Sequence, residues 1–302
     1  MNKLLVICGA TATGKTELAI ECAKKLDSEI ISADSQLVYK NLDIGTAKPS
    51  ITERQGVIHH MIDIVDPVSD FSVSDYERKA VPIIENLLNK GKVPIICGGT
   101  GFYINSILYK LSYGNVAADK SIREKYEKVL AEKGKDYLYS LLKNFDPVTA
   151  EKLHPNDTKR IIRALEIFEA GGKRKSEIKD SYLPRYNFSA FAVDYPRDEL
   201  YERIDKRIDV MLGRGLINEV KRLLKDGINE NNQCMQAIGY KEVVDFLKND
   251  NNDSTLRDII KKNTHHYAKR QITFFKKLNG IHWIKPGMAN SDTVLEIFNE
   301  QR

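Results

Sequence analysis

Apolar runs alternate with helical periodicities along the first third of the chain. Continuous apolar runs typical of buried strands occur at residues 3–8, 29–32 and 93–97, and amphipathic helical patterns such as 75–90 follow them. This alternation predicts a parallel sheet with helices on both faces. Because ligands bind at the carboxyl ends of the strands in such sheets, the residues after the three runs are expected to meet in one pocket.

The pattern becomes helical and strongly charged between residues 113 and 186. Helix signals lie near 120–133, 136–144 and 156–170, and prolines and glycines mark the turns between them. This segment is predicted to be a mostly helical insertion.

A strand-like run at residues 188–193 follows the insertion, and a last one lies at 281–284 after further helical patterns. We therefore predict an α/β fold with a P-loop-type parallel sheet core and helices on both faces. Residues 1–112 and 187–302 are expected to form the core domain, and residues 113–186 the helical insertion domain.

A glycine-rich loop joins the first apolar run to the first predicted helix. Its glycines allow backbone N–H groups to surround an anion, the helix points its positive end at that anion, and Lys15 supplies a cation. Thr16 is placed to hold Mg²⁺ beside the phosphates. We predict a phosphate site here, although ATP, GTP and diphosphate esters present similar oxygens. The loop consists of Gly9, Ala10, Thr11, Ala12, Thr13, Gly14, Lys15 and Thr16.

Two other predicted strand ends carry polar groups. Asp34 follows the second apolar run, so its carboxylate can accept a proton, orient a nucleophile or bind magnesium, or else serve only as a turn former. Residues 98–101 follow the third run, and Thr100 there places a hydroxyl at a helix start among glycines that permit close approach. Both groups are expected to face the phosphate loop.

Positive charge is concentrated in two segments. The net charge is only +5, yet residues 159–175 hold six basic side chains against two acidic ones, and residues 261–277 hold six and no acids. Lys159, Arg160 and Arg163 share one helical face, which suits contact with successive phosphates. Together with the phosphate loop, these segments favour a polyanionic partner. The aromatic residues of the second segment, Tyr267, Phe274 and Phe275, are expected to belong to the core.

Other classes of function find little support in the sequence. No apolar run approaches the roughly 18 residues that span a bilayer, so we expect no membrane association and a cytoplasmic location. The four cysteines are far apart, which favours buried thiols over disulfides or a zinc site. His59 and His60 are adjacent in a strand-like run and point to opposite faces, so we expect a structural role for them.

Several blocks occur along nearly the whole chain in the order typical of one protein family. They resemble the tRNA dimethylallyltransferases, also called tRNA isopentenyltransferases. Departures are small: Ala10 replaces the usual proline, Thr13 serine, Phe274 tryptophan and Lys276 arginine, and none of these removes a group that the chemistry needs. The matching blocks are residues 9–16, 34–39, 42–49, 59–63, 98–103, 157–166, 236–242 and 268–276.

The resemblance implies transfer of a dimethylallyl group from dimethylallyl diphosphate to N6 of the adenosine 3′ of the anticodon. The tRNAs concerned read codons that begin with U. In this interpretation the phosphate loop, Lys15 and Mg²⁺ at Thr16 hold the departing diphosphate, and Asp34 is the general base. Thr100 binds diphosphate or positions the amine, so Asp34, Thr100 and Lys15 form the expected catalytic set.

A stacked adenine must be extruded into such a pocket, and contacts elsewhere must offset the cost. We expect the insertion domain to bind the tRNA anticodon stem-loop, and we expect the enzyme to be a monomer. Asp34, Ser35, Gln36, Leu37 and Thr100 are expected to contact the tRNA near the extruded base. The contacts expected from the insertion are Arg123, Lys159, Arg160, Ile161, Ile162 and Arg163.

Two alternatives remain open at this point. A small-molecule or nucleoside kinase would use Asp34 to deprotonate a hydroxyl and Lys15 to hold ATP, and a nucleic-acid-binding NTPase would also explain the basic helices. Both predict nucleotide turnover, whereas prenyl transfer predicts that ATP is dispensable. The sequence also leaves open whether the basic segment at 261–277 serves the tRNA or the diphosphate.

Overall fold

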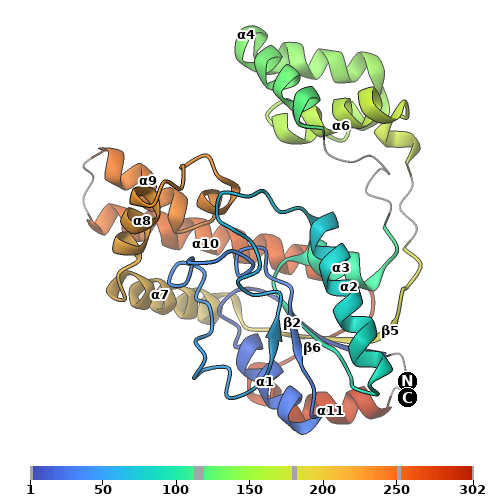
Figure 1. The fold of residues 1–302 in the computed structure, drawn as a ribbon, viewed down its shortest axis with the longest axis vertical. Helices are drawn as coiled ribbons and strands as arrows, with labels where there is room; N and C mark the ends of the chain where they lie inside the picture. The colour runs from blue at the N-terminus through green and yellow to red at the C-terminus, as the bar shows by residue number, and fades with distance from the viewer. Residues whose placement is uncertain (1–2, 112–118, 179–181, 250–252, 301–302) are drawn as a thin grey trace. The chain divides into compact units, whose positions relative to one another are not determined.

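The chain forms two compact units in the computed structural model (Figure 1), which describes residues 3–111, 119–178, 182–249 and 253–300. Unit 1 comprises residues 1–108 and 184–302, and unit 2 comprises residues 109–183. Within unit 1, the Arg185 amide donates a hydrogen bond of 2.7 Å to the Leu108 carbonyl, which joins the two crossing segments. The boundary expected between residues 112 and 113 lies outside the described residues.

Unit 1 is built on a sheet whose described strands are all parallel, as the sequence predicted. The strand order is β3-β2-β4-β1-β5-β6, so the three strands that precede the expected site residues are adjacent. The strands are β1 (Lys3–Cys8), β2 (Ile30–Ser32), β3 (His59–His60), β4 (Ile95–Gly98), β5 (Asn187–Val193) and β6 (Ile281–Ile284).

Helices cover both faces of this sheet. Leu5 and Ile7 of β1 belong to a hydrophobic cluster that includes residues of the first and last helices. Leu4 and Val6 are also fully buried and point to the opposite face, because side chains alternate along a strand. The helices of unit 1 are α1 (Lys15–Lys25), α2 (Val73–Asn89), α3 (Gly101–Leu108), α7 (Arg197–Gly213), α8 (Leu216–Lys225), α9 (Tyr240–Asn249), α10 (Asp253–Phe275) and α11 (Ser291–Glu300).

Helix α11 was not predicted from the sequence. It lies against α1 (Figure 1), where Val294 and Phe298 complete the core beneath β1. Lys3 donates a hydrogen bond of 2.7 Å to the Phe298 carbonyl and so ties this last helix to the first strand.

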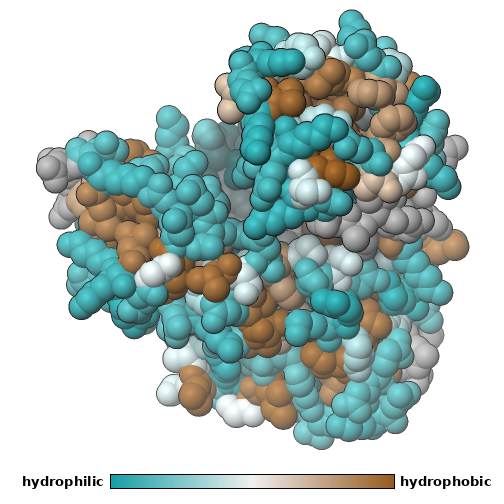
Figure 2. Space-filling view, turned by 45° about the horizontal axis from the view of Figure 1, so that its top comes forward, coloured by the Kyte–Doolittle hydropathy of each residue, from teal (hydrophilic) through white to brown (hydrophobic). Residues whose placement is uncertain are grey.

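Unit 2 is helical, in agreement with the pattern of its sequence. It contains α4 (Lys120–Phe145), the short α5 (Pro147–Ala150) and α6 (Thr158–Gly171). The two helices expected at 120–133 and 136–144 form one element, α4, which is interrupted at Gly134 with a φ of 78°. Its core is small and apolar, and hydrophilic side chains cover much of the face seen in Figure 2.

None of the helices in the described part of the chain is both long and apolar enough to cross a membrane.

Candidate active site

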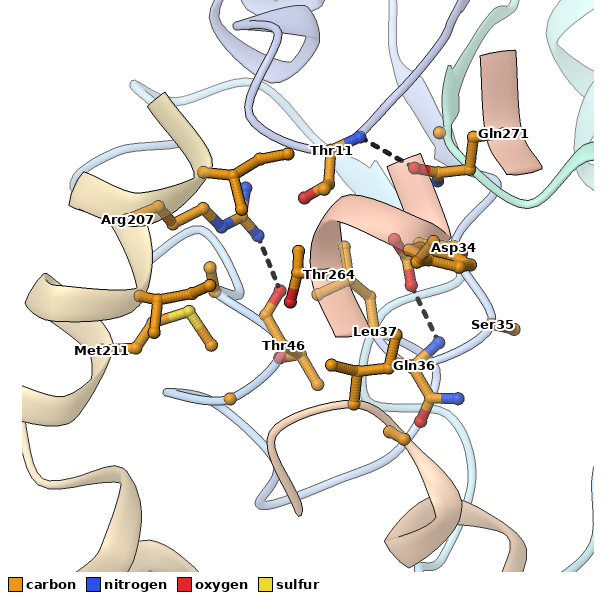
Figure 3. Close-up of a pocket in the computed structure, with 18 of the residues that line it drawn as sticks. Thr11, Asp34, Ser35, Gln36, Leu37, Thr46, Arg207, Met211, Thr264 and Gln271 are labelled. Atoms are coloured by element: carbon orange, nitrogen blue, oxygen red, sulfur yellow. Dashed lines mark hydrogen bonds between the residues drawn. The ribbon is translucent and has the colours of Figure 1, made fainter. Parts of the chain in front are cut away.

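A cavity of about 360 Å³ opens at the carboxyl ends of β1, β2 and β4 (Figure 3). This location confirms that the three strand ends meet in one pocket. Helices α7 and α10 complete its wall, and α10 lies beside α7 (Figure 1). The polar side chains that line it are Thr11, Lys15, Thr16, Asp34, Ser35, Gln36, Thr46, Arg207, Gln236, Thr264, Tyr267, Arg270 and Gln271.

The phosphate loop has the conformation that its glycines predict. Gly9 and Gly14 have φ values of 130° and 79°, which favour glycine, and α1 begins at Lys15 directly after the loop. The Thr13 hydroxyl and the Lys15 ammonium both donate to the Ala10 carbonyl, at 2.9 and 3.0 Å. Of the eight loop residues, Thr11, Lys15 and Thr16 line the cavity.

Two cationic side chains, Lys15 and Arg207, lie half-buried in the same cavity beside this loop. Burial lowers the pKa of Lys15, and the nearby Arg207 guanidinium lowers it further. Burial also lowers the pKa of Arg207, whereas the Asp34 carboxylate opposes that shift. Figure 3 shows Arg207 extending from α7 toward Thr46, whose carbonyl lies 3.4 Å from its guanidinium. Two desolvated cations in one cavity favour an anionic ligand.

Arg207 was not predicted as a site residue. It belongs to an ordinary charged helix in the sequence, 192 residues after Lys15, and no local motif marks it. Only the packing of α7 against the strand ends brings it to the phosphate loop.

Asp34 is held by its own segment. Its Oδ1 atom accepts a hydrogen bond of 2.9 Å from the Gln36 amide, so the side chain has a fixed orientation. It is also the only carboxylate among the described residues that line the cavity, which contains Lys15, Arg207 and Arg270. A single carboxylate among three cations is suited to accept a proton beside a bound anion.

Thr100 lies one layer behind the cavity lining. Its hydroxyl accepts a hydrogen bond of 2.9 Å from the Ser35 amide, and its amide donates to the Ala33 carbonyl at 3.0 Å. These bonds fix the segment that carries Asp34. These contacts favour a role for Thr100 in positioning the Asp34 segment, which differs from the expected contact with the diphosphate or the amine.

The glycines beside Thr100 permit very close packing. A Cβ atom at Gly98 would lie 2.1 Å from the Ala33 carbonyl oxygen, and one at Gly101 would lie 2.2 Å from the Phe274 ring. The glycines of this loop therefore allow other parts of the protein to pack closely against it. Phe275 is fully buried, as expected for a core aromatic, whereas Phe274 is half-buried and packs on Gly101.

Helix α10 supplies cavity residues that were not predicted as site residues, among them Gln271 and Tyr267. Gln271 accepts a hydrogen bond of 2.9 Å from the Thr11 amide through Oε1, and its Nε2 donates to the Gly99 carbonyl at 2.9 Å. It therefore connects the phosphate loop, through the bond to Thr11 seen in Figure 3, with the loop after β4. Tyr267 was expected in the core but lines the cavity. Burial and the Asp34 carboxylate raise its pKa, so its hydroxyl keeps its proton.

In unit 2, the expected basic residues lie on the exposed side of α6. Lys159 and Arg160 are exposed, and the Arg160 guanidinium lies 3.8 Å from Asp157. The structure corrects two members of the expected set, since the side chains of Ile161 and Ile162 are buried in the unit's hydrophobic core. They hold the helix in place and cannot present their side chains to RNA.

The other two arginines of the expected set, Arg123 and Arg163, share one buried carboxylate. The side chain of Glu166 is 0% exposed and accepts hydrogen bonds from Arg123 at 3.0 Å, from Arg163 at 2.8 Å and from the Asp119 amide at 2.7 Å. Burial alone would raise the pKa of Glu166, but these bonds outweigh it and hold the pKa below its usual value. Glu166 thus links α4 to α6 and orients both guanidinium groups.

The histidines and cysteines take no part in this cavity, apart from Cys97, which lines it. His60 bonds to Glu29 at 2.6 Å and His59 to the Val57 carbonyl at 2.9 Å, so both have the expected structural role. All four cysteines are buried and free. The described residues contain no cluster of His, Cys, Asp or Glu that could hold a metal ion by itself.

Comparisons with known proteins identify the family that this chain resembles. The family model described as IPP transferase matches residues 37–278. A tRNA dimethylallyltransferase of Acetivibrio thermocellus is 44% identical over 97% of this chain and 94% of that protein. One of Caldanaerobacter subterraneus is 46% identical over 93% of this chain and 91% of its own length.

Solved structures extend the similarity to the fold. The tRNA isopentenylpyrophosphate transferase of Bacillus halodurans is 38% identical, with a TM-score of 0.74 over 100% of this chain and 96% of that one. A eukaryotic dimethylallyltransferase acting on tRNA is 30% identical, with a TM-score of 0.84 over 100% of this chain and 79% of that one. With a family model that spans most of the chain and relatives above 40% identity, the chain belongs to the IPP transferase family, the tRNA dimethylallyltransferases.

Proposed function

We propose that the chain transfers a dimethylallyl group from dimethylallyl diphosphate to the exocyclic N6 of the adenosine 3′ of the anticodon in tRNA. One observation carries this proposal: a phosphate loop, two half-buried cations and, among the described lining residues, a single carboxylate share the same cavity. The phosphate loop and the two cations suit a diphosphate leaving group, and the carboxylate suits an amine that must lose a proton. The activity rests on the family to which the chain belongs.

The diphosphate of the donor occupies the end of the cavity at the phosphate loop in this proposal. Lys15, Arg207 and the amides of the loop stabilise the negative charge that develops as the bond between the allylic carbon and oxygen breaks. Arg207 joins Gly9, Ala10, Thr11, Ala12, Thr13, Gly14, Lys15 and Thr16 in the proposed donor-binding set.

The residues present also fit a magnesium ion. Mg²⁺ is commonly bound by one or two protein oxygens together with substrate phosphates and water, and the cavity offers the Thr16 hydroxyl and the Asp34 carboxylate. We propose that Thr16 holds it. When bound, the ion would neutralise charge on the leaving diphosphate.

Asp34 acts at the other end of the reacting pair. The N6 lone pair forms a bond to the allylic carbon while the carbon–oxygen bond breaks and its electrons leave with the diphosphate. The proton released from N6 passes to the Asp34 carboxylate, which the Gln36 amide keeps in a fixed orientation. Thr100 holds this segment through Ser35, and we assign it a positioning role.

The acceptor adenine must leave the stack of the anticodon loop to reach this carboxylate. Ser35, Gln36 and Leu37 follow Asp34 in the cavity lining, so they are the residues proposed to contact the extruded base. Extrusion costs a few kcal/mol, and RNA contacts elsewhere must supply that free energy.

Unit 2 provides the remaining proposed RNA contacts. The basic residues proposed to bind the backbone of the anticodon stem-loop lie in the N-terminal halves of α4 and α6. They are Arg123 of α4 and Lys159, Arg160 and Arg163 of α6. We propose action as a monomer in the cytoplasm, where the tRNA substrate is found.

Mass analysis of tRNA nucleosides tests this function against a kinase or an NTPase switch. Incubation with dimethylallyl diphosphate, Mg²⁺ and unmodified tRNA is expected to yield a dimethylallyl adduct on adenosine without ATP. Diphosphate is expected to be released only when donor and tRNA are both present. ATP-dependent phosphoryl transfer without a prenylated nucleoside would contradict the proposal.

A further inference from the structure

One wall of the active-site cavity is formed by a loop that has no role in the reaction proposed above. Residues 43–49, which we call the wall loop, lie between β2 and β3 along the chain. The Thr46 carbonyl lies 3.4 Å from the Arg207 guanidinium (Figure 3), so the loop contacts one of the two cations proposed to bind the diphosphate. The wall-loop residues that line the cavity are Gly45, Thr46, Ala47 and Pro49.

A buried carboxylate of α8 holds the wall loop from behind the cavity lining. Glu219 is 6% exposed and is not among the residues that line the cavity. Its two carboxylate oxygens accept hydrogen bonds from three consecutive amides, those of Asp43 at 3.1 Å, Ile44 at 2.8 Å and Gly45 at 3.1 Å. Successive backbone N–H groups form a concavity that binds anions, and here the protein's own carboxylate fills it. The loop backbone is therefore fixed by charge-assisted hydrogen bonds.

A tyrosine of α9 completes this arrangement. The Tyr240 hydroxyl donates a hydrogen bond of 2.6 Å to Glu219. Burial and the carboxylate raise the pKa of Tyr240, so its hydroxyl keeps the proton that it donates. A Cβ atom at Gly45 would lie 2.4 Å from the Tyr240 ring, so only a glycine lets the loop pack this closely on the ring. Helices α8 and α9 thus fix the same three-residue stretch of the loop.

A lysine fixes the other end of the wall loop. Only 5% of the Lys48 side chain is exposed. Its ammonium donates to the Tyr39 carbonyl at 2.9 Å and to the Asp43 carboxylate at 2.7 Å, and its amide donates to the Asp43 carbonyl at 2.9 Å. Because both ends of the loop are tied, the Thr46 carbonyl between them has a defined position. Support of this kind keeps a binding side chain in its productive geometry.

We propose that Glu219 is a positioning residue for the prenyl-transfer reaction. By fixing the wall loop it holds the Thr46 carbonyl against Arg207, and this contact keeps the guanidinium where it binds the diphosphate of the donor. Glu219 acts only through that contact, since it does not line the cavity. The inference rests on the proposed function, which supplies the diphosphate and the role of Arg207.

Glu85 provides a matched control for Glu219. It also accepts a hydrogen bond of 2.6 Å from a tyrosine, Tyr186, but it belongs to α2, and neither residue of this pair lines the cavity. Glu219→Gln and Glu85→Gln each remove one negative charge from unit 1 and keep the size of the side chain. Calorimetry measures the Kd of inorganic diphosphate in the presence of Mg²⁺, and urea denaturation checks that each variant is folded.

Glu219→Gln is expected to raise the Kd for diphosphate about 10-fold. The NH2 group of Gln would face the backbone N–H groups donor to donor and displace the loop, and a displacement of about 1 Å can cost up to about 10²-fold. Glu85→Gln should keep the wild-type Kd. The sign of the change is diagnostic, because loss of a negative charge by itself strengthens the attraction of an anion. Affinity for an anticodon stem-loop RNA should stay unchanged in both variants.

A double-variant cycle tests the route through Arg207. If Glu219 acts by holding this arginine, Glu219→Gln should have little further effect on the Kd for diphosphate in a chain that already carries Arg207→Ala. Additive losses in the double variant would overturn the inference. So would a wild-type Kd in folded Glu219→Gln, or an equal loss of RNA affinity, which would indicate general damage to the fold.

Two further variants carry the comparison if Glu219→Gln does not fold. Tyr240→Phe and Tyr186→Phe each remove one tyrosine–glutamate hydrogen bond of 2.6 Å. Tyr240→Phe should raise the Kd for diphosphate about 3-fold, the order expected for one hydrogen bond, and Tyr186→Phe should not. Equal Kd values in this pair would overturn the inference. A wild-type chain that binds diphosphate and RNA but never prenylates the RNA would contradict the proposed function alone.

Discussion

At the scale of single residues, Asp34 and Arg207 differ in how far the sequence could identify them. Asp34 follows a buried strand directly, and the rule that ligands bind at strand ends places it in the pocket. Arg207 and Gln271 reach the same pocket from distant helices, and Gln271 contacts Thr11 across 260 residues of sequence. Contacts at that separation depend on how the helices pack, and the local sequence of α7 and α10 carries no sign of them.

Replacing Asp34 by Asn tests its role as a proton acceptor. Asn keeps an oxygen to accept the hydrogen bond of the Gln36 amide, so the local geometry is expected to survive. Turnover should fall by about 10²–10⁴-fold, since a general base acts in the transition state. Single-turnover prenylation and a separate measurement of tRNA affinity check this. A collapse of tRNA binding with intact turnover per bound complex would show that Asp34 is a binding residue instead.

At the scale of secondary-structure elements, α4 and α6 depend on a few polar links between them. The periodicity of the sequence predicted α6 and predicted α4 as two separate helices. Ile161 and Ile162 were expected to belong to an RNA-binding stretch. Both are buried in the core with Leu138 and Leu142, whereas the neighbouring Arg160 is exposed. A contiguous block of sequence is therefore not a contiguous surface on a helix.

Glu166 and Glu169 offer a matched pair of substitutions on α6. Glu169 pairs with Lys125 and Tyr126 of α4 at a partly exposed position, whereas Glu166 is fully buried between two arginines. Glu166→Gln should lower the free energy of unfolding by about 1–3 kcal/mol, because it removes the counter-charge of buried hydrogen bonds. Glu169→Gln should cost less. Urea denaturation of the full chain compares them, and equal losses would contradict the special role of Glu166.

The same substitution should change the response to acid. The folded pKa of Glu166 lies below its unfolded value, so its stabilising contribution is complete above that unfolded value, near 4.5, and is lost as pH falls through the folded pKa. The Glu166→Gln variant lacks this contribution at every pH. The stability gap between wild type and variant should therefore be largest near neutral pH and narrow below about pH 4.5 in thermal unfolding curves.

At the scale of the whole molecule, the sequence predicted the parallel sheet and the helical insertion because both follow from long, repeated patterns. It missed α11, which is short and comes after the last predicted strand. Val294 and Phe298 are spaced to lie on one face of a helix, and the structure shows that this face packs against α1 and β1.

Charge on unit 2 should contribute to the affinity of the whole enzyme for RNA. Arg160 is exposed and loosely paired, so Arg160→Ala should weaken tRNA binding and reduce the salt slope by about 0.9. The KM for the donor should stay the same. Lys90→Ala, an exposed position after α2, serves as the control for loss of one charge. An identical salt slope in wild type and Arg160→Ala would remove Arg160 from the proposed contacts.

The bridge formed by Gln271 has a consequence for protein synthesis. One amide near the end of the chain connects the Thr11 N–H and the Gly99 carbonyl, which leave the ribosome much earlier. A nascent chain that stops before α10 therefore has its phosphate loop and its carboxylate but lacks the connection between them. The link between the two loops should therefore form only after α10 has left the ribosome, and chains that terminate before α10 should be inactive.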